Sequence, residues 1–176
     1  MALPTLRDGD LVLRPKRQED ADAITAACQD PEIPRWTFVP SPYTRADAEA
    51  FIASSAAEEA AGKSAGFLAV DSSDDTLLGS FSVMELDREP GYAEIGYWVS
   101  REARGRGIAT RGVRLLADWA RDAFGLDRID VLPHKDNAAS RRVAEKAGFR
   151  DTGELVGTPR AGIEEPIYAV YVWRRT

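Results

Sequence analysis

The sequence predicts a mixed α/β fold with a mostly antiparallel sheet, and three observations lead to this prediction. Hydrophobic patterns of strand period and helix period alternate along the chain without internal repeats. Three strand-like runs between residues 66 and 99 are separated by short turns rich in Asp, Ser, Pro and Gly, which is typical of antiparallel hairpins. A glycine-rich turn then joins a strand to a long amphipathic run. We therefore expect one α/β domain over residues 1–176.

Size, charge and cysteine content narrow the class of protein. The 176 residues are 44% hydrophobic and carry a formal net charge of −6, with an isoelectric point near 4.9. This acidity argues against general nucleic-acid binding. Cys28 is the single cysteine, so the sequence predicts no internal disulfide and no metal site based on cysteine spacing. No run is apolar and long enough to cross a membrane, and we expect a cytoplasmic protein without a membrane partner.

The first part of the chain predicts a strand, a helix and a loop. Leu11–Arg14 is a short strand that stops at Pro15, and Glu19–Gln29 has the helical period. Residues 31–42 contain four prolines and several apolar side chains, Trp36 among them. This composition favours a loop with exposed apolar content, which could line a pocket, rather than a regular element.

The next helix has signals at both ends. Thr44 is its expected N-cap, and Asp47 three residues later makes a short relative of the capping box. An alanine-rich run extends to about Ala61, and Gly62 ends it.

Strands and helices then alternate to the C-terminus. Ile108–Phe124 has apolar residues at helical spacing before Gly125, and Asn137–Ala147 is a further helix, which Gly148 ends. The expected strands of this part are Gly66–Val70, Thr76–Glu85, Tyr92–Val99, Arg128–Leu132, Arg150–Val156 and Ile167–Trp173.

The turn Arg104–Thr110 has the chemistry of a polyanion site. Backbone N–H groups at a helix N-terminus lack partners within the helix, and the helix macrodipole is positive there. Nearby arginines add guanidinium groups that suit phosphate: Arg101, Arg104, Arg106, Arg111 and Arg114. Two common phosphate motifs are excluded, because Thr110 stands where a dinucleotide-binding turn has its third glycine and no Gly-Lys-Ser/Thr occurs. The expected ligand carries phosphates.

Four segments occur in a characteristic order, namely Glu94–Val99, Arg104–Thr110, Asn137–Ser140 and Glu145–Phe149. The second contains an Arg/Gln-x-x-Gly-x-Gly/Ala pattern, which Arg104, Gly107 and Ala109 meet. In order and spacing the four segments resemble the GCN5-related N-acetyltransferase (GNAT) superfamily, specifically its Rim-type branch, which acetylates the N-termini of ribosomal proteins. With the first and last strands included, the resemblance extends over nearly the whole chain.

The resemblance implies a fold and a co-substrate. The fold is a twisted, mostly antiparallel sheet of six to seven strands flanked by about four helices, with a cleft between the fourth and fifth strands. The acyl donor is acetyl-CoA, whose pyrophosphate suits the turn amides, and no metal is needed. The residues implied in coenzyme binding are Val99, Arg104, Gly105, Arg106, Gly107, Ile108, Ala109, Thr110 and Asn137.

Glu94 is the candidate general base. Acyl transfer to an amine requires a group that accepts the proton of the ammonium form. Strand alternation puts Glu94 on the same face as Gly96 and Trp98, on the strand that leads into the implied cleft. The alternative is a surface-facing glutamate without a chemical role.

Ser140 is the candidate general acid, and this role comes from the resemblance alone. In Rim-type enzymes a serine at this position is thought to protonate the departing thiolate, whereas many other superfamily members use a tyrosine of the same helix. Here no tyrosine occurs between Tyr97 and Tyr168. Because a serine hydroxyl is a poor acid, Ser140 could instead position the thioester or cap the helix.

Some of the remaining reactive side chains have a structural interpretation alone, and the others have both a functional and a structural interpretation. His134 is interpreted as a solvated loop histidine and Cys28 as a core residue. Trp36 either lines the acceptor pocket or plugs the core. Three cations at helical spacing either reach the 3′-phosphate of the coenzyme or form a solvated charged face: Arg141, Arg142 and Lys146.

These inferences predict an enzyme that moves an acetyl group from acetyl-CoA directly to a primary amine, foremost a protein N-terminal α-amine. Three alternatives stay open: a different acyl-CoA such as succinyl-CoA, a small amine acceptor such as a polyamine or an antibiotic, and a non-catalytic acyl-CoA-binding sensor. The acidic composition favours a cationic acceptor in each case. Related enzymes often dimerise, so a homodimer is a further expectation.

Overall fold

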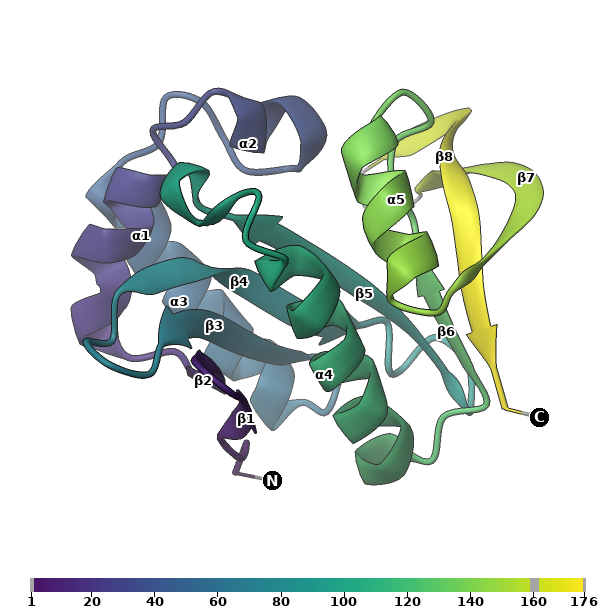
Figure 1. Cartoon of the computed structure of the whole chain (residues 1–176), viewed down its shortest axis with the longest axis horizontal. Helices are drawn as coiled ribbons and strands as arrows, with labels where there is room; N and C mark the ends of the chain where they lie inside the picture. The colour runs from purple at the N-terminus through teal and green to yellow at the C-terminus, as the bar shows by residue number, and fades with distance from the viewer. Residues whose placement is uncertain (1, 159–161, 176) are drawn as a thin grey trace.

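The computed structural model describes residues 2–158 and 162–175, which build one eight-stranded sheet with helices on both faces (Figure 1). Its strands are β1 (Leu6–Asp8), β2 (Leu11–Pro15), β3 (Ala65–Asp71), β4 (Leu77–Met84), β5 (Tyr92–Val99), β6 (Arg128–Val131), β7 (Arg150–Thr158) and β8 (Ile163–Arg174). Its helices are α1 (Ala21–Ala27), α2 (Glu32–Trp36), α3 (Arg45–Ala60), α4 (Ile108–Phe124) and α5 (Ala138–Lys146), with 3₁₀ turns at Gln18–Asp20 and Arg101–Ala103.

The expected strands and helices are present, and the structure adds β1 and α2. The strand count is therefore eight instead of six to seven. β1 is only three residues long, with a half-buried Leu6 and two exposed side chains, so it has no periodic pattern to detect. It is held by antiparallel pairing with β2 across the turn at Gly9.

The helix α2 corrects the expectation of a loop over residues 31–42. Pro34 lies in the first turn of α2, where backbone N–H groups have no partner within the helix, so the missing N–H of proline costs nothing there. Ile33 is buried and fastens the short helix to the rest of the molecule. Proline is therefore compatible with this helix, because Pro34 lies in its first turn.

The helix α3 begins as predicted. The Thr44 hydroxyl accepts a hydrogen bond from the Asp47 N–H, and the Asp47 carboxylate accepts one from the Thr44 N–H at 2.8 Å. This reciprocal pair satisfies two backbone donors at the helix end. Within the residues that are described, no helix is long and apolar enough to cross a membrane.

Sheet topology creates the opening on which the site depends. The strand order is β1-β2-β3-β4-β5-β6-β8-β7, and every adjacent pair is antiparallel except β5 and β6. These two are paired over three positions only: Tyr92 with Arg128, Ala93 with Ile129 and Glu94 with Asp130. Beyond Glu94, β5 continues beside β4 while β6 runs beside β8, so the strands diverge (Figure 1). They are the fourth and fifth strands of the sequence prediction, and the expected opening between them is confirmed.

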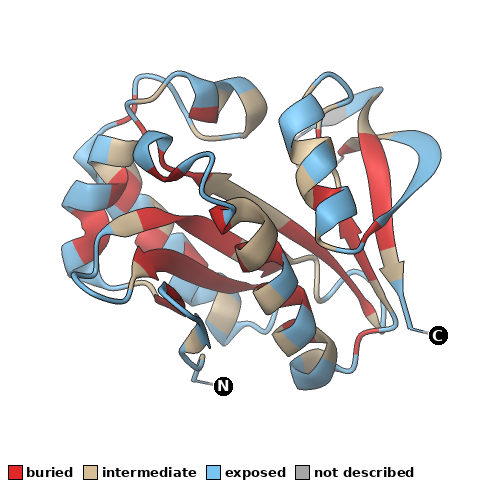
Figure 2. Ribbon diagram, viewed as in Figure 1, coloured by how far each residue is buried: buried red, intermediate tan, exposed pale blue. Residues whose placement is uncertain are grey.

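Two hydrophobic cores lie on the two faces of the sheet. Along β3, Phe67 and Ala69 pack into the core under α4, whereas Leu68 and Val70 pack into the core under α1 and α3. Successive strand residues point to opposite faces, which produces this division. Figure 2 shows the central strands as the buried layer between the helices.

The helix α4 lies unusually close to the sheet at one glycine. A Cβ atom added at Gly112 would lie 2.4 Å from the Phe81 ring, so a larger residue cannot be accommodated without moving that ring. Phe81 in turn stacks on Tyr97 of β5, with ring centroids 5.5 Å apart and an interplanar angle of 12°. The packing of α4 thus fixes an aromatic side chain at the edge of the opening.

Candidate active site

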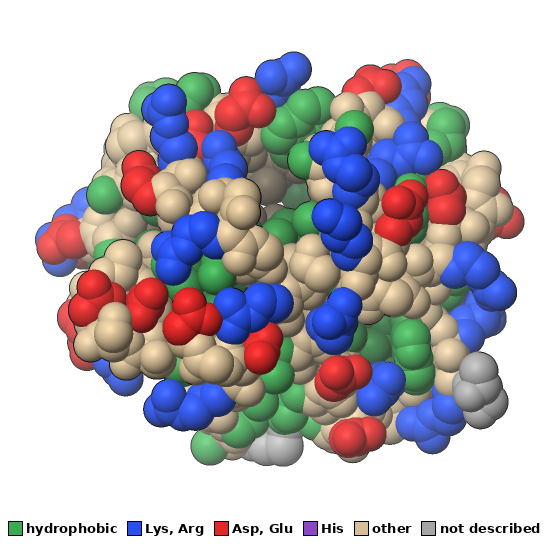
Figure 3. Space-filling model, in the orientation of Figure 1, with side chains coloured by type: hydrophobic (Ala, Val, Ile, Leu, Met, Phe, Trp, Pro, Cys, Tyr) green, Lys and Arg blue, Asp and Glu red, His purple; other side chains and the backbone are tan. Residues whose placement is uncertain are grey.

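A cleft of about 1000 Å³ occupies the opening between β5 and β6. One wall comes from β5 and the first turn of α4, the opposite wall from α5 and the segment before it, and residues of the 32–43 segment line a further part. Figure 3 shows the surface hollowed between α5 and the turn that precedes α4. All the site residues predicted from the sequence line this cleft except Arg106.

The glycine-rich turn presents backbone to the cleft as predicted. Gly105 and Gly107 adopt φ values of 73° and 76°, a left-handed conformation that side chains other than glycine rarely adopt. Gly107 is the N-cap of α4 and carries no side chain, so the first-turn N–H groups of Ile108, Ala109 and Thr110 receive no side-chain cap. Uncapped donors at a positive helix end are suited to an anion.

The two arginines of the turn have different surroundings. Arg104 lines the cleft, and its guanidinium is 2.6 Å from the carboxylate of Asp30, while it also donates to the Val99 carbonyl at 3.3 Å. Arg104 therefore joins the turn to the chain segment that precedes α2. Arg106 lies outside the cleft lining, and its guanidinium is 3.6 Å from Asp71 instead.

Asn137 and Ser140 lie at the start of α5, and the structure shows which of the two caps the helix. The Asn137 side chain caps the helix by accepting a hydrogen bond from the Ser140 N–H at 3.0 Å. The idea that Ser140 caps the helix is therefore wrong, because it lies in the first turn and Asn137 holds the cap position. The Ser140 hydroxyl instead lies 2.8 Å from the Tyr97 hydroxyl.

Tyr97 is a cleft residue that sequence reasoning did not find. It lines the cleft from β5, and burial raises the pKa of its hydroxyl to about 12. Ser140 lies 43 residues further along the chain, so no local pattern signals the pair. The signal that existed was strand alternation, which puts Tyr97 on the face of β5 opposite to Glu94.

Glu94 is buried with 8% of its surface exposed, so the alternative of a surface-facing glutamate is wrong. One carboxylate oxygen accepts hydrogen bonds from the Tyr92 hydroxyl at 2.8 Å and from Arg88 at 3.2 Å. Trp98 packs into the core under α1 and α3, whereas Ile95 packs into the core under α4. Glu94 therefore faces the α1 and α3 side, as the predicted alternation requires.

Aromatic rings from three parts of the chain meet along the cleft. Trp36 of α2 lies 5.5 Å from His134, which lies 5.8 Å from Tyr168 of β8, and Phe38 is 6.3 Å from Tyr168. Trp36 thus lines the pocket and does not plug the core. His134 is half-buried in this wall, so its interpretation as a solvated loop residue is wrong.

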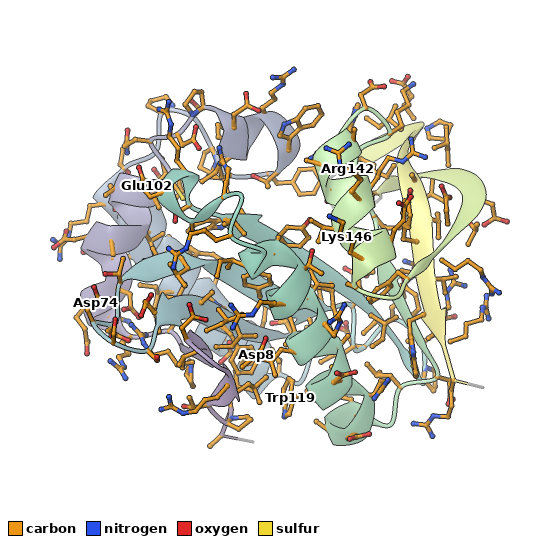
Figure 4. All side chains as sticks on the ribbon, in the orientation of Figure 1. Asp8, Asp74, Glu102, Trp119, Arg142 and Lys146 are labelled. Atoms are coloured by element: carbon orange, nitrogen blue, oxygen red, sulfur yellow. The ribbon has the colours of Figure 1, made fainter. Side chains whose placement is uncertain are left out.

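The three cations of α5 separate into two groups. Arg142 and Lys146 line the cleft, and Figure 4 shows both on the side of α5 that faces it. Arg141 instead donates to the Tyr171 hydroxyl at 3.1 Å and to Asp151 at 3.2 Å. Cys28 is buried as expected, and burial raises the pKa of its thiol to about 12.

The family described as acetyltransferase (GNAT) domain matches residues 10–150. The chain belongs to the GNAT acetyltransferase family. As an N-acetyltransferase of this family, the protein takes its acetyl group from acetyl-CoA. Over the part of the chain that the structure describes, no cluster of three or more His, Cys, Asp or Glu side chains is placed to hold a metal ion.

Relatives of this GNAT protein occur in Bacillus subtilis (strain 168). YoaA, an uncharacterized N-acetyltransferase, is 30% identical over 154 residues, which cover 86% of this chain and 86% of YoaA. YdaF, provisionally named a ribosomal N-acetyltransferase, is 37% identical over 81 residues, which cover 46% of this chain and 44% of YdaF. The match to YdaF thus spans less than half of either protein.

A solved structure shares the GNAT fold over almost the whole chain. Ribosomal-protein-S5-alanine acetyltransferase from Vibrio fischeri aligns with a TM-score of 0.82 at 20% sequence identity, over 97% of this chain and 96% of that one. This agreement confirms the fold predicted from the resemblance, and the neighbour is by name a ribosomal-protein acetyltransferase.

Proposed function

We propose that this GNAT enzyme transfers the acetyl group of acetyl-CoA directly to the α-amine at the N-terminus of a protein. The observation that carries the proposal is the arrangement about β5. Glu94 lines the cleft from β5, and Ser140 lines it from α5. Glu94 lies on one face of β5, and Tyr97, which contacts Ser140, lies on the other. A base and an acid on either side of one opening suit direct transfer between two substrates that enter from the two sides.

The donor side is assigned to the turn before α4 and to α5. The first-turn N–H groups of α4 and the backbone of Gly105 and Gly107 would hold the pyrophosphate, and Val99 and Asn137 would border the pantetheine arm. Arg142 and Lys146 are placed to attract the remaining phosphate. When bound, acetyl-CoA supplies the thioester that the amine attacks.

The proton steps are assigned to two side chains. Glu94 accepts a proton from the acceptor amine, so that a neutral nitrogen attacks the thioester carbonyl as the C–S bond breaks. Ser140 donates its hydroxyl proton to the sulfur, and the Tyr97 hydroxyl at 2.8 Å supports the serine oxygen as it loses that proton. The nitrogen keeps the acetyl group and loses its second proton as the amide forms, a proton returns to the serine oxygen, and the sulfur leaves as a thiol.

The acceptor side is assigned to the aromatic wall that contains Trp36, Phe38, His134 and Tyr168. This wall is apolar, while Glu32, Asp47 and Glu94 add negative charge to the cleft lining. An amine next to a short side chain suits that combination of charge and apolar surface. The Rim-type resemblance and the ribosomal names of YdaF and the Vibrio fischeri enzyme support a protein N-terminus as its source. From the same resemblance we also propose that the enzyme is cytoplasmic and that it forms a homodimer.

The test is a thiol-release assay on a panel of acceptors. Peptides with free N-termini are compared with the same peptides carrying a blocked N-terminus, and with polyamines and aminoglycosides, using acetyl-CoA or succinyl-CoA as donor. We expect thiol release only with free N-terminal peptides and acetyl-CoA, with the acetyl group on the α-amine by mass spectrometry. Turnover with polyamines or aminoglycosides alone would overturn the proposed acceptor. Coenzyme binding without thiol release from any acceptor would favour the sensor function.

A further inference from the structure

The carboxylate of Glu94 belongs to a compact group of side chains outside the glycine-rich motif. Arg88, Tyr92, Arg128 and Asp130, here called the Tyr92 cluster, line a second cavity of about 310 Å³. Glu94 lines both this cavity and the cleft, so the two cavities meet at its side chain. Tyr92 and Arg88 of the cluster therefore contact the proposed base from this second cavity.

The Tyr92 hydroxyl lies between two buried carboxylates. Its oxygen is 2.8 Å from a carboxylate oxygen of Glu94 and 3.5 Å from one of Asp130. The guanidinium groups of Arg88 and Arg128 lie 5.2 Å and 5.5 Å from the centre of the Tyr92 ring. Each arginine also binds one of the carboxylates, Arg88 that of Glu94 and Arg128 that of Asp130.

The geometry determines which carboxylate receives the tyrosine proton. Arg128 binds both oxygens of Asp130, at 2.8 Å and 2.6 Å, so Asp130 already has two charged donors. A phenol has one proton, and the shorter distance directs it to Glu94. Burial and the charge of Glu94 raise the pKa of Tyr92, so its hydroxyl stays a donor throughout the neutral range.

We propose that Tyr92, assisted by Arg88, is a positioning residue for Glu94: the two donors fix one carboxylate oxygen and favour the ionised form that accepts the amine proton. This inference rests on the proposed function, in which Glu94 is the base. A hydrogen bond donated to a carboxylate stabilises its charged form. Without it the carboxylate would hold a proton at higher pH, and less of the enzyme would carry a competent base.

Other charged groups face Glu94 and must stay constant for the test. The second cavity is lined by Glu85, Arg88, Glu89, Arg128, Asp130 and Glu154. The cleft is lined by Glu32, Asp47, Arg104, His134, Arg142 and Lys146. Replacing Tyr92 by phenylalanine leaves all of these in place and keeps the ring on which two arginines stack, so it removes the hydroxyl alone.

The experiment measures kcat/KM for the acceptor as a function of pH. For Tyr92→Phe we expect the acidic limb of the profile to move up by about one pH unit, because the lost donor raises the pKa of the base. KM for acetyl-CoA should stay unchanged. Arg88→Gln should move the limb in the same direction by less, because this side chain is 53% exposed and its charge is screened.

Two matched controls separate this effect from a general loss of structure. Tyr171→Phe also removes a buried tyrosine hydroxyl bonded to a glutamate, Glu145, outside both cavities. Arg121→Gln removes an arginine that is ion-paired and stacked on an aromatic ring, that of Trp173. Both controls should keep the wild-type pH profile.

The variant Glu94→Gln tests the role of Glu94 as the base separately from the positioning role of Tyr92 and Arg88. If Glu94→Gln keeps wild-type turnover, Glu94 is not the base and the proposed mechanism fails. If Glu94→Gln loses turnover while Tyr92→Phe and Arg88→Gln keep the wild-type acidic limb, the positioning role fails and the mechanism stands. Arg88 lies largely at the surface, so its variant provides this answer even if Tyr92→Phe does not fold.

Discussion

The pair of hydroxyl groups on Tyr97 and Ser140 alters what a serine can do in this cleft. A lone serine hydroxyl is a poor proton donor, because the charge left on its oxygen is unsupported. Here a second hydroxyl lies 2.8 Å away, on a ring held by stacking against Phe81. Since burial raises the pKa of Tyr97 to about 12, it stays protonated and can donate to the serine oxygen.

We therefore predict that Ser140→Ala lowers kcat about 100-fold and Tyr97→Phe about 10-fold, with little change in KM for acetyl-CoA. Because the tyrosine acts through the serine, the double variant should be no slower than Ser140→Ala. Steady-state kinetics of the four proteins check this. Independent, multiplied losses in the double variant would show that the two hydroxyls act separately.

A second prediction concerns Lys16, a half-buried cation outside the cleft. Its amine donates to the Ser55 hydroxyl at 2.8 Å, and burial lowers its pKa to about 8. The unfolded chain binds this proton up to its ordinary pKa of 10.5, so folding stability contributed by this group rises as pH increases through the interval between 8 and 10.5. Below that interval the charged amine is a constant penalty.

Lys16→Met removes this dependence at similar side-chain volume. Thermal melts of both proteins from pH 7 to 10 should show the variant more stable at pH 7, with the gap closing as pH rises. A difference in Tm that stays constant with pH would contradict the assignment.

The turn before α4 shows how one element combines backbone conformation with function. Gly107 has a φ of 76° and is the N-cap, and a methyl group added there meets no atom within 4 Å. Substitution therefore costs conformational strain but creates no internal clash. The same is true of Gly62 after α3, whose φ is 72° and which does not line the cleft.

We predict that Gly107→Ala and Gly62→Ala each destabilise the fold by about 1 kcal/mol. Only Gly107→Ala should raise KM for acetyl-CoA, by about 10-fold, because its methyl group stands where phosphate approaches the helix N-terminus. Urea unfolding and coenzyme titration measure the two effects. Equal KM values in the two variants would argue against this turn as the phosphate site.

Elements that carry their own signals were predictable from the sequence, and elements that depend on distant partners were not. Thr44 and Asp47 cap α3 through contacts three residues apart, so the helix start was foreseen. The short helix α2 and strand β1 have too few periodic residues to be recognised. In the cleft, Glu94 and Ser140 stood within recognisable motifs, whereas Tyr97 is defined by a partner 43 residues away.

For the molecule as a whole, acetyl-CoA would bind across the junction of two parts of the sheet. One wall of the cleft comes from β5 and α4, the other from α5 and the segment before it. A ligand that contacts both walls adds its binding free energy to the folding of both parts. Binding should therefore stabilise the whole chain and not a local loop.

We predict that acetyl-CoA at about 100 times its Kd raises Tm by roughly 5–10 °C. Hydrogen exchange should slow most in residues 95–99 and in α5. The matched comparison is Gly107→Ala at the same ligand concentration, which should show a smaller rise. A higher Tm of the wild-type protein without slower hydrogen exchange in α5 would show that acetyl-CoA binds elsewhere.

The three paired positions between β5 and β6 also make the sheet resemble a pair of jaws. β1 to β5 form one jaw and β6 to β8 with α5 form the other, and a bond from Arg114 to the Lys146 carbonyl links them across the helices. Glu94 occupies the last pair before the jaws part, at the pivot, while Ser140 lies out along the second jaw. Because Glu94 lies at this pivot and Ser140 lies away from it, we expect any rotation of one jaw against the other to displace Ser140 more than Glu94.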